Sequence, residues 1–181
     1  MDNKRRCKWC NLKNPLYVAY HDTEWCAPHF EDQYLYEMLI LESFQAGLSW
    51  ECVLNKRESF RKAYDHFNLT RVSSYTEMDV ERLMQDANII RHRRKIQASI
   101  QNSKVFQSIV SEYGTFYGYL CTFTKGQIFR ETNRTTNDLS DAISKDLRKR
   151  GMTFVGSTTI YSYLQAVGIL YSHDPDCFLH K

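Results

Sequence analysis

The segment Leu41-Glu42-Ser43-Phe44-Gln45-Ala46-Gly47-Leu48-Ser49-Trp50 decides the expected fold, because it places a carboxylate on an apolar helix just before a sharp corner. Leu35, Met38 and Leu39 precede Glu42 at helical spacing, so Glu42 is expected to point toward the core with them. Burying an unpaired charge is costly. Glu42 therefore requires a partner, a cationic ligand or a raised pKa.

The corner that follows is indicated by three successive residue types. Gly47 suits a left-handed residue that ends the helix, and Ser49 suits the N-cap of the next helix. Leu48 is then expected at the tip, with Trp50 directly after it. A core helix that tolerates one satisfied glutamate would explain Glu42, but it would not explain an apolar tip, a corner and a tryptophan together.

Length and composition predict one compact domain over residues 1–181. The chain has 181 residues, of which 43% are hydrophobic and 14% aromatic, enough for one well-buried core. The net charge of +3 is too small to indicate a nucleic-acid partner by itself. The polar start and the lack of a long apolar stretch favour a soluble, intracellular protein, in which six cysteines are expected to be thiols or metal ligands.

Apolar periodicity predicts an all-α fold without convincing strands. A second amphipathic helix is expected over 50–67, and a third begins after Thr76, with Asp79 at the capping-box position. A fourth runs from about Arg91 to Gly114. Further helical segments are expected at 115–123, 140–150 and 157–167, with an irregular connection over 124–137.

A short connection joins the third and fourth helices. Asn88 is expected to adopt a positive φ there, before the basic run that starts at Arg91. Positive side chains at a helix start oppose the helix dipole and call for an anion. A DNA phosphate on the free amides would satisfy them. An ordinary pair of antiparallel helices with solvated charges fits this segment equally well.

Together these residues resemble the 3-methyladenine DNA glycosylase I family, a branch of the helix-hairpin-helix DNA glycosylases. The likeness extends from Cys7 to Cys177. It is densest over 14–22, 42–50, 79–98 and 149–166. The resemblance implies a compact helical domain with a helix-hairpin-helix motif at about 77–110. The Asn88 and Arg94 positions depart from the usual glycine and small residue of that motif.

The same resemblance implies roles for particular side chains. Glu42 is the expected catalytic residue, and Tyr20, Trp50 and Trp9 are expected to bind the base. Electron-rich rings and a carboxylate suit a cationic alkylated adenine. The residues expected to contact DNA are Gln45, Gly47, Leu48, Asn88 and Arg93, with Leu48 filling the hole that the flipped base leaves.

A structural zinc site is the expected cofactor site. Cys7, His21, His173 and Cys177 make a Cys2His2 set, and the resemblance implies that it pins the tails 7–21 and 173–177 together. The sequence alone does not bring the two ends of the chain together. Cys10 leaves an alternative open, because Cys7-x2-Cys10 has the spacing of a zinc knuckle and would displace His21.

The expected function is that of a monofunctional DNA glycosylase that flips 3-methyladenine out of alkylated double-stranded DNA and hydrolyses its N-glycosidic bond. We expect a monomer in the cytoplasm without membrane attachment. One alternative is a non-catalytic helix-hairpin-helix DNA-binding module. Another is a zinc-stapled helical interaction domain. Glu42 counts against both, since neither needs an inward carboxylate.

Overall fold

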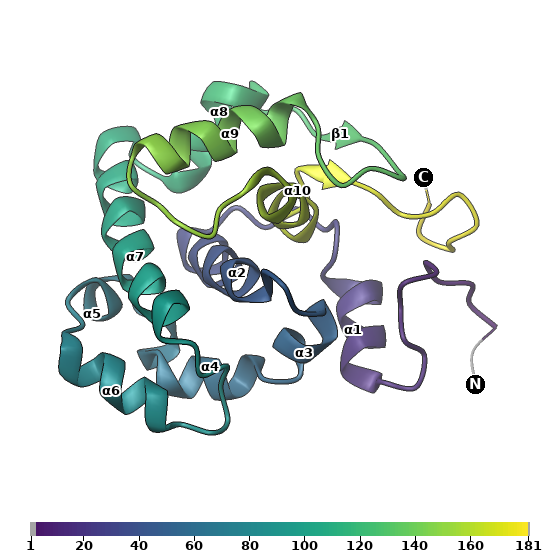
Figure 1. The fold of residues 1–181 in the computed structure, drawn as a ribbon. Coiled ribbons are helices and arrows are strands. Elements are labelled where there is room, and N and C mark those ends of the chain that lie inside the picture. The colour runs from purple at the N-terminus through teal and green to yellow at the C-terminus, as the bar shows by residue number, and fades with distance from the viewer. Residues whose placement is uncertain (1–2, 181) are drawn as a thin grey trace.

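The computed structural model describes residues 3–180, and it is predominantly helical (Figure 1). Residues 1–2 and 181, the ends of the expected domain, lie outside the described residues. In chain order the elements are α1 (Pro15–Thr23), α2 (Asp32–Gln45), α3 (Trp50–Leu54), α4 (Arg57–Ala63), the 3-10 helix η1 (Asp65–Phe67), α5 (Leu69–Ser73), α6 (Glu77–Gln85), α7 (Arg93–Tyr113), α8 (Phe116–Thr124), β1 (Phe129–Arg130), α9 (Asp138–Lys149), α10 (Ser157–Ala166) and β2 (Leu170–Tyr171).

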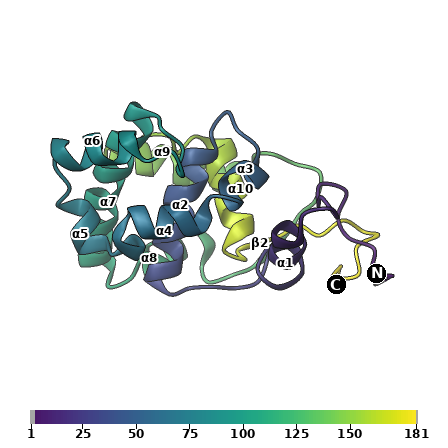
Figure 2. The ribbon, with the colours of Figure 1, turned by 90° about the horizontal axis from the view of Figure 1, so that it is seen from below.

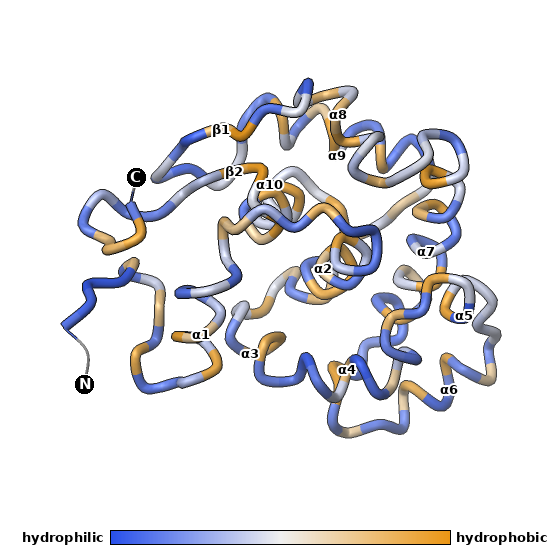
Figure 3. The backbone as a smooth tube through the Cα atoms, turned by 180° about the vertical axis from the view of Figure 1, so that it is seen from behind, coloured by the Kyte–Doolittle hydropathy of each residue, from blue (hydrophilic) through white to orange (hydrophobic). Residues whose placement is uncertain are grey.

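The core forms around α2 and α10, which lie at the centre while the other helices surround them (Figures 1 and 2). Every residue from Leu35 to Phe44 is buried, which confirms the inward position of Glu42. Figure 3 shows hydrophobic stretches in α2, α10 and β2, and a largely hydrophilic segment before α1. The sequence around Glu42 thus forms a central helix instead of a surface helix.

The expected continuous helix over 50–67 is wrong. The structure divides it into α3, α4 and η1, and Asp65, His66 and Phe67 have φ values of 49°, 54° and 54°. Within α4, the Arg57 guanidinium is buried, with Nε 2.5 Å from Glu37 Oε1. The apolar repeat alone did not reveal that a buried ion pair would orient this segment.

A small pair of strands corrects the prediction of a purely helical chain. β1 and β2 are parallel, with Phe129 opposite Leu170. The Phe129 N–H donates to Ile169 O at 2.9 Å, and the Glu131 N–H donates to Tyr171 O at 3.1 Å. These bonds satisfy backbone groups of the otherwise irregular connection, which explains why a two-residue strand forms without an alternating pattern.

The expected helix ends are largely confirmed. Asp79 accepts from the Thr76 N–H at 2.9 Å in a capping box at the start of α6. Gly114, Gly151 and Gly168 all have positive φ, directly after α7, after the C-cap Arg150 of α9, and after the C-cap Val167 of α10. Local signals therefore located these ends correctly.

The connection between α6 and α7 differs from the expected one. It spans 86–92, and Asn88 is not among the residues with positive φ, so that expectation is wrong. The Asn88 N–H instead donates to Asp86 Oδ1 at 2.9 Å, and its side-chain amide donates to the same atom at 3.0 Å. The Asp86 carboxylate makes the turn without a left-handed residue.

The described terminal segments, residues 3–14 and 172–180, lie side by side next to α1 in both views (Figures 1 and 2). The Phe178 N–H donates to Arg5 O at 2.8 Å, and Arg5 and Asp176 form an ion pair at 2.8 Å. Over residues 3–180, no helix combines the length and apolar character that crossing a bilayer requires.

Candidate active site and metal centre

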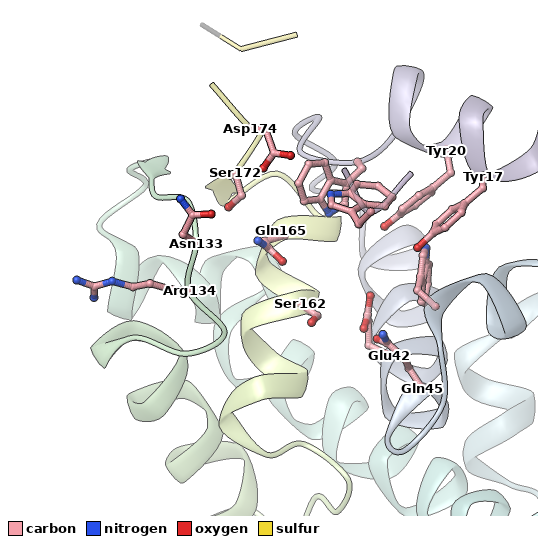
Figure 4. Close-up of a pocket in the computed structure, with 13 residues that line it drawn as sticks. Tyr17, Tyr20, Glu42, Gln45, Asn133, Arg134, Ser162, Gln165, Ser172 and Asp174 are labelled. Carbon is pink, nitrogen blue, oxygen red and sulfur yellow. The ribbon is translucent and has the colours of Figure 1, made fainter. Parts of the chain in front are cut away.

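A cavity of about 320 Å³ lies between α2 and α10, beside the tails of the chain (Figure 4). One wall is aromatic and the other is mainly polar. The lining residues are Trp9, Tyr17, Tyr20, Trp25, Glu42, Gln45, Trp50, Asn133, Arg134, Ser162, Gln165, Ser172 and Asp174. Five of the predicted site residues thus share one cavity: Glu42, Tyr20, Trp50, Trp9 and Gln45.

Glu42 lies in the last turn of α2 and faces α10 across the cavity (Figure 4). Its side chain lines the cavity, although the residue is only 3% exposed. Among the described residues, no group donates a hydrogen bond to its buried Oε2 atom. Burial raises the pKa of Glu42 to about 8. A carboxylate in this position favours a ligand that carries positive charge or hydrogen-bond donors.

The aromatic wall comes from α1, the N-terminal tail and the start of α3. The Tyr20 and Trp50 rings lie 5.3 Å apart between centroids at an angle of 47°. The centroid of the Trp9 ring lies 5.2 Å from that of Tyr17 and 4.7 Å from that of Trp25. Trp50 Nε1 is buried and lacks a partner within residues 3–180. The wall therefore offers flat faces together with one spare donor.

The corner after α2 has the predicted form. Ala46 has φ −46° and ψ 114°, Gly47 has φ 78°, and the Leu48 N–H donates to Gln45 O at 2.6 Å. These angles and this bond define a type II turn, which requires a positive φ at its third residue. Leu48 is 42% exposed at the tip, and the Ser49 side chain caps α3 by accepting from the Cys52 N–H.

Within the basic run, Arg93 is paired with carboxylates and Lys95 is hydrogen-bonded to main-chain carbonyls. Arg93 Nη1 and Nη2 each lie 2.5 Å from a carboxylate oxygen, of Glu77 and of Glu81 respectively. Lys95 is buried and donates to main-chain carbonyls at the end of α2. Part of the charge that called for an anion in the sequence is therefore satisfied within the fold.

The four predicted metal ligands come together and are all buried. The ligand atoms of Cys7, His21, His173 and Cys177 lie within 4.8 Å of one another. Cys177 Sγ lies 3.5 Å from both His21 Nε2 and His173 Nδ1, and Cys7 Sγ lies 3.5 Å from His173 Nδ1. Bond lengths of about 2.0–2.3 Å to a tetrahedral zinc ion would place ligand atoms at such separations. The donor set thus fits zinc.

An ion pair orients one of these ligands. His21 Nδ1 lies 2.8 Å from Asp22 Oδ1, and Arg6 Nη2 lies 2.6 Å from Asp22 Oδ2. A carboxylate on the second ring nitrogen of a histidine fixes the tautomer that coordinates metal. Cys10 lies outside the cluster, where its Sγ atom is 3.9 Å from Tyr17 O. The geometry therefore favours His21 over Cys10 as a ligand.

Similarity to known proteins agrees with this site. The family model for methyladenine glycosylases matches residues 9–180. The chain belongs to this family. DNA-3-methyladenine glycosylase 1 of Escherichia coli is 43% identical over 95% of both chains, and the DNA-3-methyladenine glycosylase of Haemophilus influenzae is 36% identical over 95% of this chain and 96% of that protein. The resemblance seen in the sequence is thereby confirmed.

Solved structures of methyladenine glycosylases share the fold. A crystal structure of 3-methyladenine DNA glycosylase I superposes with a TM-score of 0.93 at 42% identity, covering 98% of this chain and all of that one. A structure of the Staphylococcus aureus enzyme, which concerns the structural basis of its 3-methyladenine recognition, superposes with a TM-score of 0.91 at 32% identity. The match covers 96% of this chain and 97% of that one.

The polar wall of the cavity was not predicted from the sequence. It comprises Asn133 and Arg134 of the connection before α9, Ser162 and Gln165 of α10, and Ser172 and Asp174 after β2 (Figure 4). Ser162 and Gln165 are three positions apart, so they lie on one helix face. This spacing is the only local sequence signal that could have indicated any of the six polar-wall residues. The other four residues reach the cavity only because their segments fold back beside it, and no short sequence motif indicates such a tertiary arrangement.

Proposed function

We propose that this protein is a monofunctional DNA glycosylase that releases 3-methyladenine from alkylated DNA and leaves an abasic site. The observation that carries the proposal is the buried carboxylate of Glu42, which lacks a partner among the described residues and faces the cavity beside Tyr20 and Trp50. Relatives named DNA-3-methyladenine glycosylase support it.

Charge provides the selectivity in this proposal. Adenine methylated at N3 within DNA is cationic, whereas normal adenine is neutral. A cation in the cavity stabilises the ionised form of Glu42 and so offsets the effect of burial on its pKa. The faces of Tyr20 and Trp50 also attract a cationic ring. Normal adenine gains neither interaction and would leave the carboxylate uncompensated.

The reaction needs little covalent assistance from the protein. The alkylated base carries the positive charge that makes it a good leaving group, so the bond to the sugar breaks dissociatively. We assign to Glu42 the electrostatic support of the departing base and of the sugar cation, with water as the final nucleophile. The products are the free base and an abasic sugar, and neither strand is cut.

DNA engagement is assigned to two surfaces. The base must leave the duplex to reach the cavity, and Leu48, with Gln45 beside it, fills the vacated space. We propose that α6, the connection 86–92 and α7 form the helix-hairpin-helix motif that holds a backbone phosphate of double-stranded DNA. The protein is expected to act as a cytoplasmic monomer.

Zinc is proposed as a structural cofactor. Cys7 and His21 from one tail and His173 and Cys177 from the other would hold the ion, and they complete a tetrahedral nitrogen and sulfur set. When bound, the ion supplies a cross-link between the tails and no group for the reaction. Because the Trp9 ring lies 5.3 Å from the His21 ring, this cross-link would also support the aromatic wall.

The test is incubation of the protein with methylated duplex DNA, followed by chromatographic identification of any released base. Free 3-methyladenine and heat- or alkali-labile abasic sites, without direct strand cleavage, are expected. Binding to methylated DNA with no released base would instead support a non-catalytic DNA-binding module. An unmethylated duplex of the same sequence serves as the control substrate.

A further inference from the structure

Lys95 is a buried lysine whose ammonium lies at the carboxyl end of α2, although the residue belongs to the first turn of α7. Its Nζ atom donates to Phe44 O at 2.7 Å and to Ala46 O at 2.5 Å. The ring of Phe154, from the α9–α10 connection, has its centroid 5.9 Å from the same atom. The ammonium thus joins three segments that are distant in sequence.

Helix-dipole electrostatics show which of the two helices, α2 or α7, the Lys95 ammonium stabilises. A positive charge in the first turn of α7 opposes the dipole of its own helix. At the end of α2 the same charge is favourable, because the last carbonyls of a helix lack intrahelical donors. Lys95 therefore stabilises the end of α2 and the corner after it, at some cost to α7.

One of the two bonds determines the form of the corner. Types I and II turns differ by a flip of the central peptide, which here joins Ala46 to Gly47. Lys95 holds the carbonyl of that peptide, so a flip to type I would break the 2.5 Å bond. Because the peptide is trans, the Gly47 N–H points away from Lys95, on the opposite side of the turn.

We propose that Lys95 is a positioning residue for lesion recognition, which locks the turn of residues 45–48 so that Leu48 is presented to the duplex in one orientation. This rests on the proposed glycosylase function. Lys95 does not line the cavity, so it acts through the turn and not on the base. A preformed tip enters the duplex without the loss of conformational freedom that a mobile tip would incur.

The first test compares Lys95→Met with Lys104→Met, which removes a charge from an exposed site on the same helix. Amide hydrogen exchange of the peptide containing Gly47 and Leu48 should be at least tenfold faster in Lys95→Met only. Binding to a duplex with an abasic-site analogue should weaken at least fivefold. Affinity for free 3-methyladenine, followed by tryptophan fluorescence, should stay within twofold.

Gly47→Ala provides a second variant that leaves Lys95 in place. An added Cβ would meet nothing within 4 Å, but φ 78° is unfavourable for alanine, so the turn should change form without a clash. We expect this variant to reproduce the exchange and binding pattern of Lys95→Met. It therefore tests whether the form of the turn governs binding to the duplex even if Lys95→Met does not fold.

A double-mutant cycle with Leu48→Ala tests whether Lys95 acts through the tip. The double variant Lys95→Met, Leu48→Ala should bind the abasic duplex no more weakly than Leu48→Ala alone. Additive losses, unchanged exchange, or an equal loss of free-base affinity would overturn the proposal. If the unmodified protein releases no 3-methyladenine, the glycosylase function fails separately, and the exchange data still decide whether Lys95 holds the turn.

Discussion

Glu42 is almost completely buried, and it has a carboxyl oxygen that no described group satisfies. An unpaired buried carboxyl group is destabilising. The cavity in front of it gives the reason, since a cationic ring bound there would satisfy the charge. Residues with strongly perturbed pKa in a cleft are typical of functional sites.

Replacing Glu42 with glutamine keeps the shape of the side chain and removes its charge. The Glu42→Gln variant should fold, yet bind 3-methyladenine more weakly and excise it more slowly, by about 1–3 kcal/mol for one charge-assisted contact. Single-turnover excision from methylated DNA and fluorescence titration with the free base measure both effects. Unchanged excision and base binding would show that Glu42 is only a core residue.

The raised pKa of Glu42 also predicts how stability depends on pH. Burial moves the pKa from 4.5 to about 8, so between these values the folded protein holds a proton that the unfolded chain has lost. The carboxyl group therefore destabilises the fold increasingly as pH rises through this interval, by at most about 1.4 kcal/mol per pH unit.

Glu42→Gln should remove this dependence. Denaturant unfolding at pH 5 and pH 8 should show that the variant gains stability relative to the unmodified protein as pH rises. A stability difference that is independent of pH would contradict the burial of an ionisable Glu42.

At the scale of elements, the α6–α7 pair changes the interpretation of the basic run. Arg93 is engaged by Glu77 and Glu81, whereas the Arg94 side chain is exposed and has no ion-pair partner among the described residues. A phosphate bound at the start of α7 must compete with two carboxylates for Arg93 but with none for Arg94. Arg94, which departs from the small residue expected there, is thus the freer cation.

We therefore predict different salt effects for two variants of this hairpin. If the hairpin holds one phosphate through an exposed cation, Arg94→Gln should reduce the slope of log affinity against log salt by about 1. Arg93→Gln should change the slope less, since that charge is already paired. Lys104→Gln, farther along α7, is the control. Equal slopes in all three variants would remove the hairpin from the DNA interface.

At the scale of the whole molecule, the two tails meet at the cluster of Cys7, His21, His173 and Cys177. Residues more than 150 positions apart in sequence thereby lie next to the aromatic wall of the cavity. A metal cross-link between them would close almost the entire chain and would strongly limit the conformational freedom of the unfolded state.

We predict one zinc ion per chain and a marked loss of thermal stability after chelation. Cys177→Ser should lose the metal, whereas Cys10→Ser should retain it, because Cys10 Sγ lies outside the cluster. Elemental analysis of protein purified without chelator measures both. Metal-free wild-type protein, or loss of zinc from Cys10→Ser, would refute the assigned ligand set.

The sequence by itself determined the features that depend on neighbours along the chain. The burial of Glu42, the positive φ of Gly47, the exposure of Leu48 and the capping box at Thr76 all follow from helical periodicity and from residue-specific backbone preferences. Such signals extend over only a few residues, so they hold before the rest of the chain is placed.

Only the tertiary structure decided what depends on distant partners. The division of 50–67 into short helices accompanies the pairing of Arg57 with Glu37 on α2. Lys95, part of a basic run in the sequence, instead serves the end of α2. The polar wall of the cavity is assembled from three separate segments. Contacts between residues distant in sequence form only when the chain folds. Their free energy can outweigh the conformational preference of a short segment, so the sequence of that segment does not reveal them.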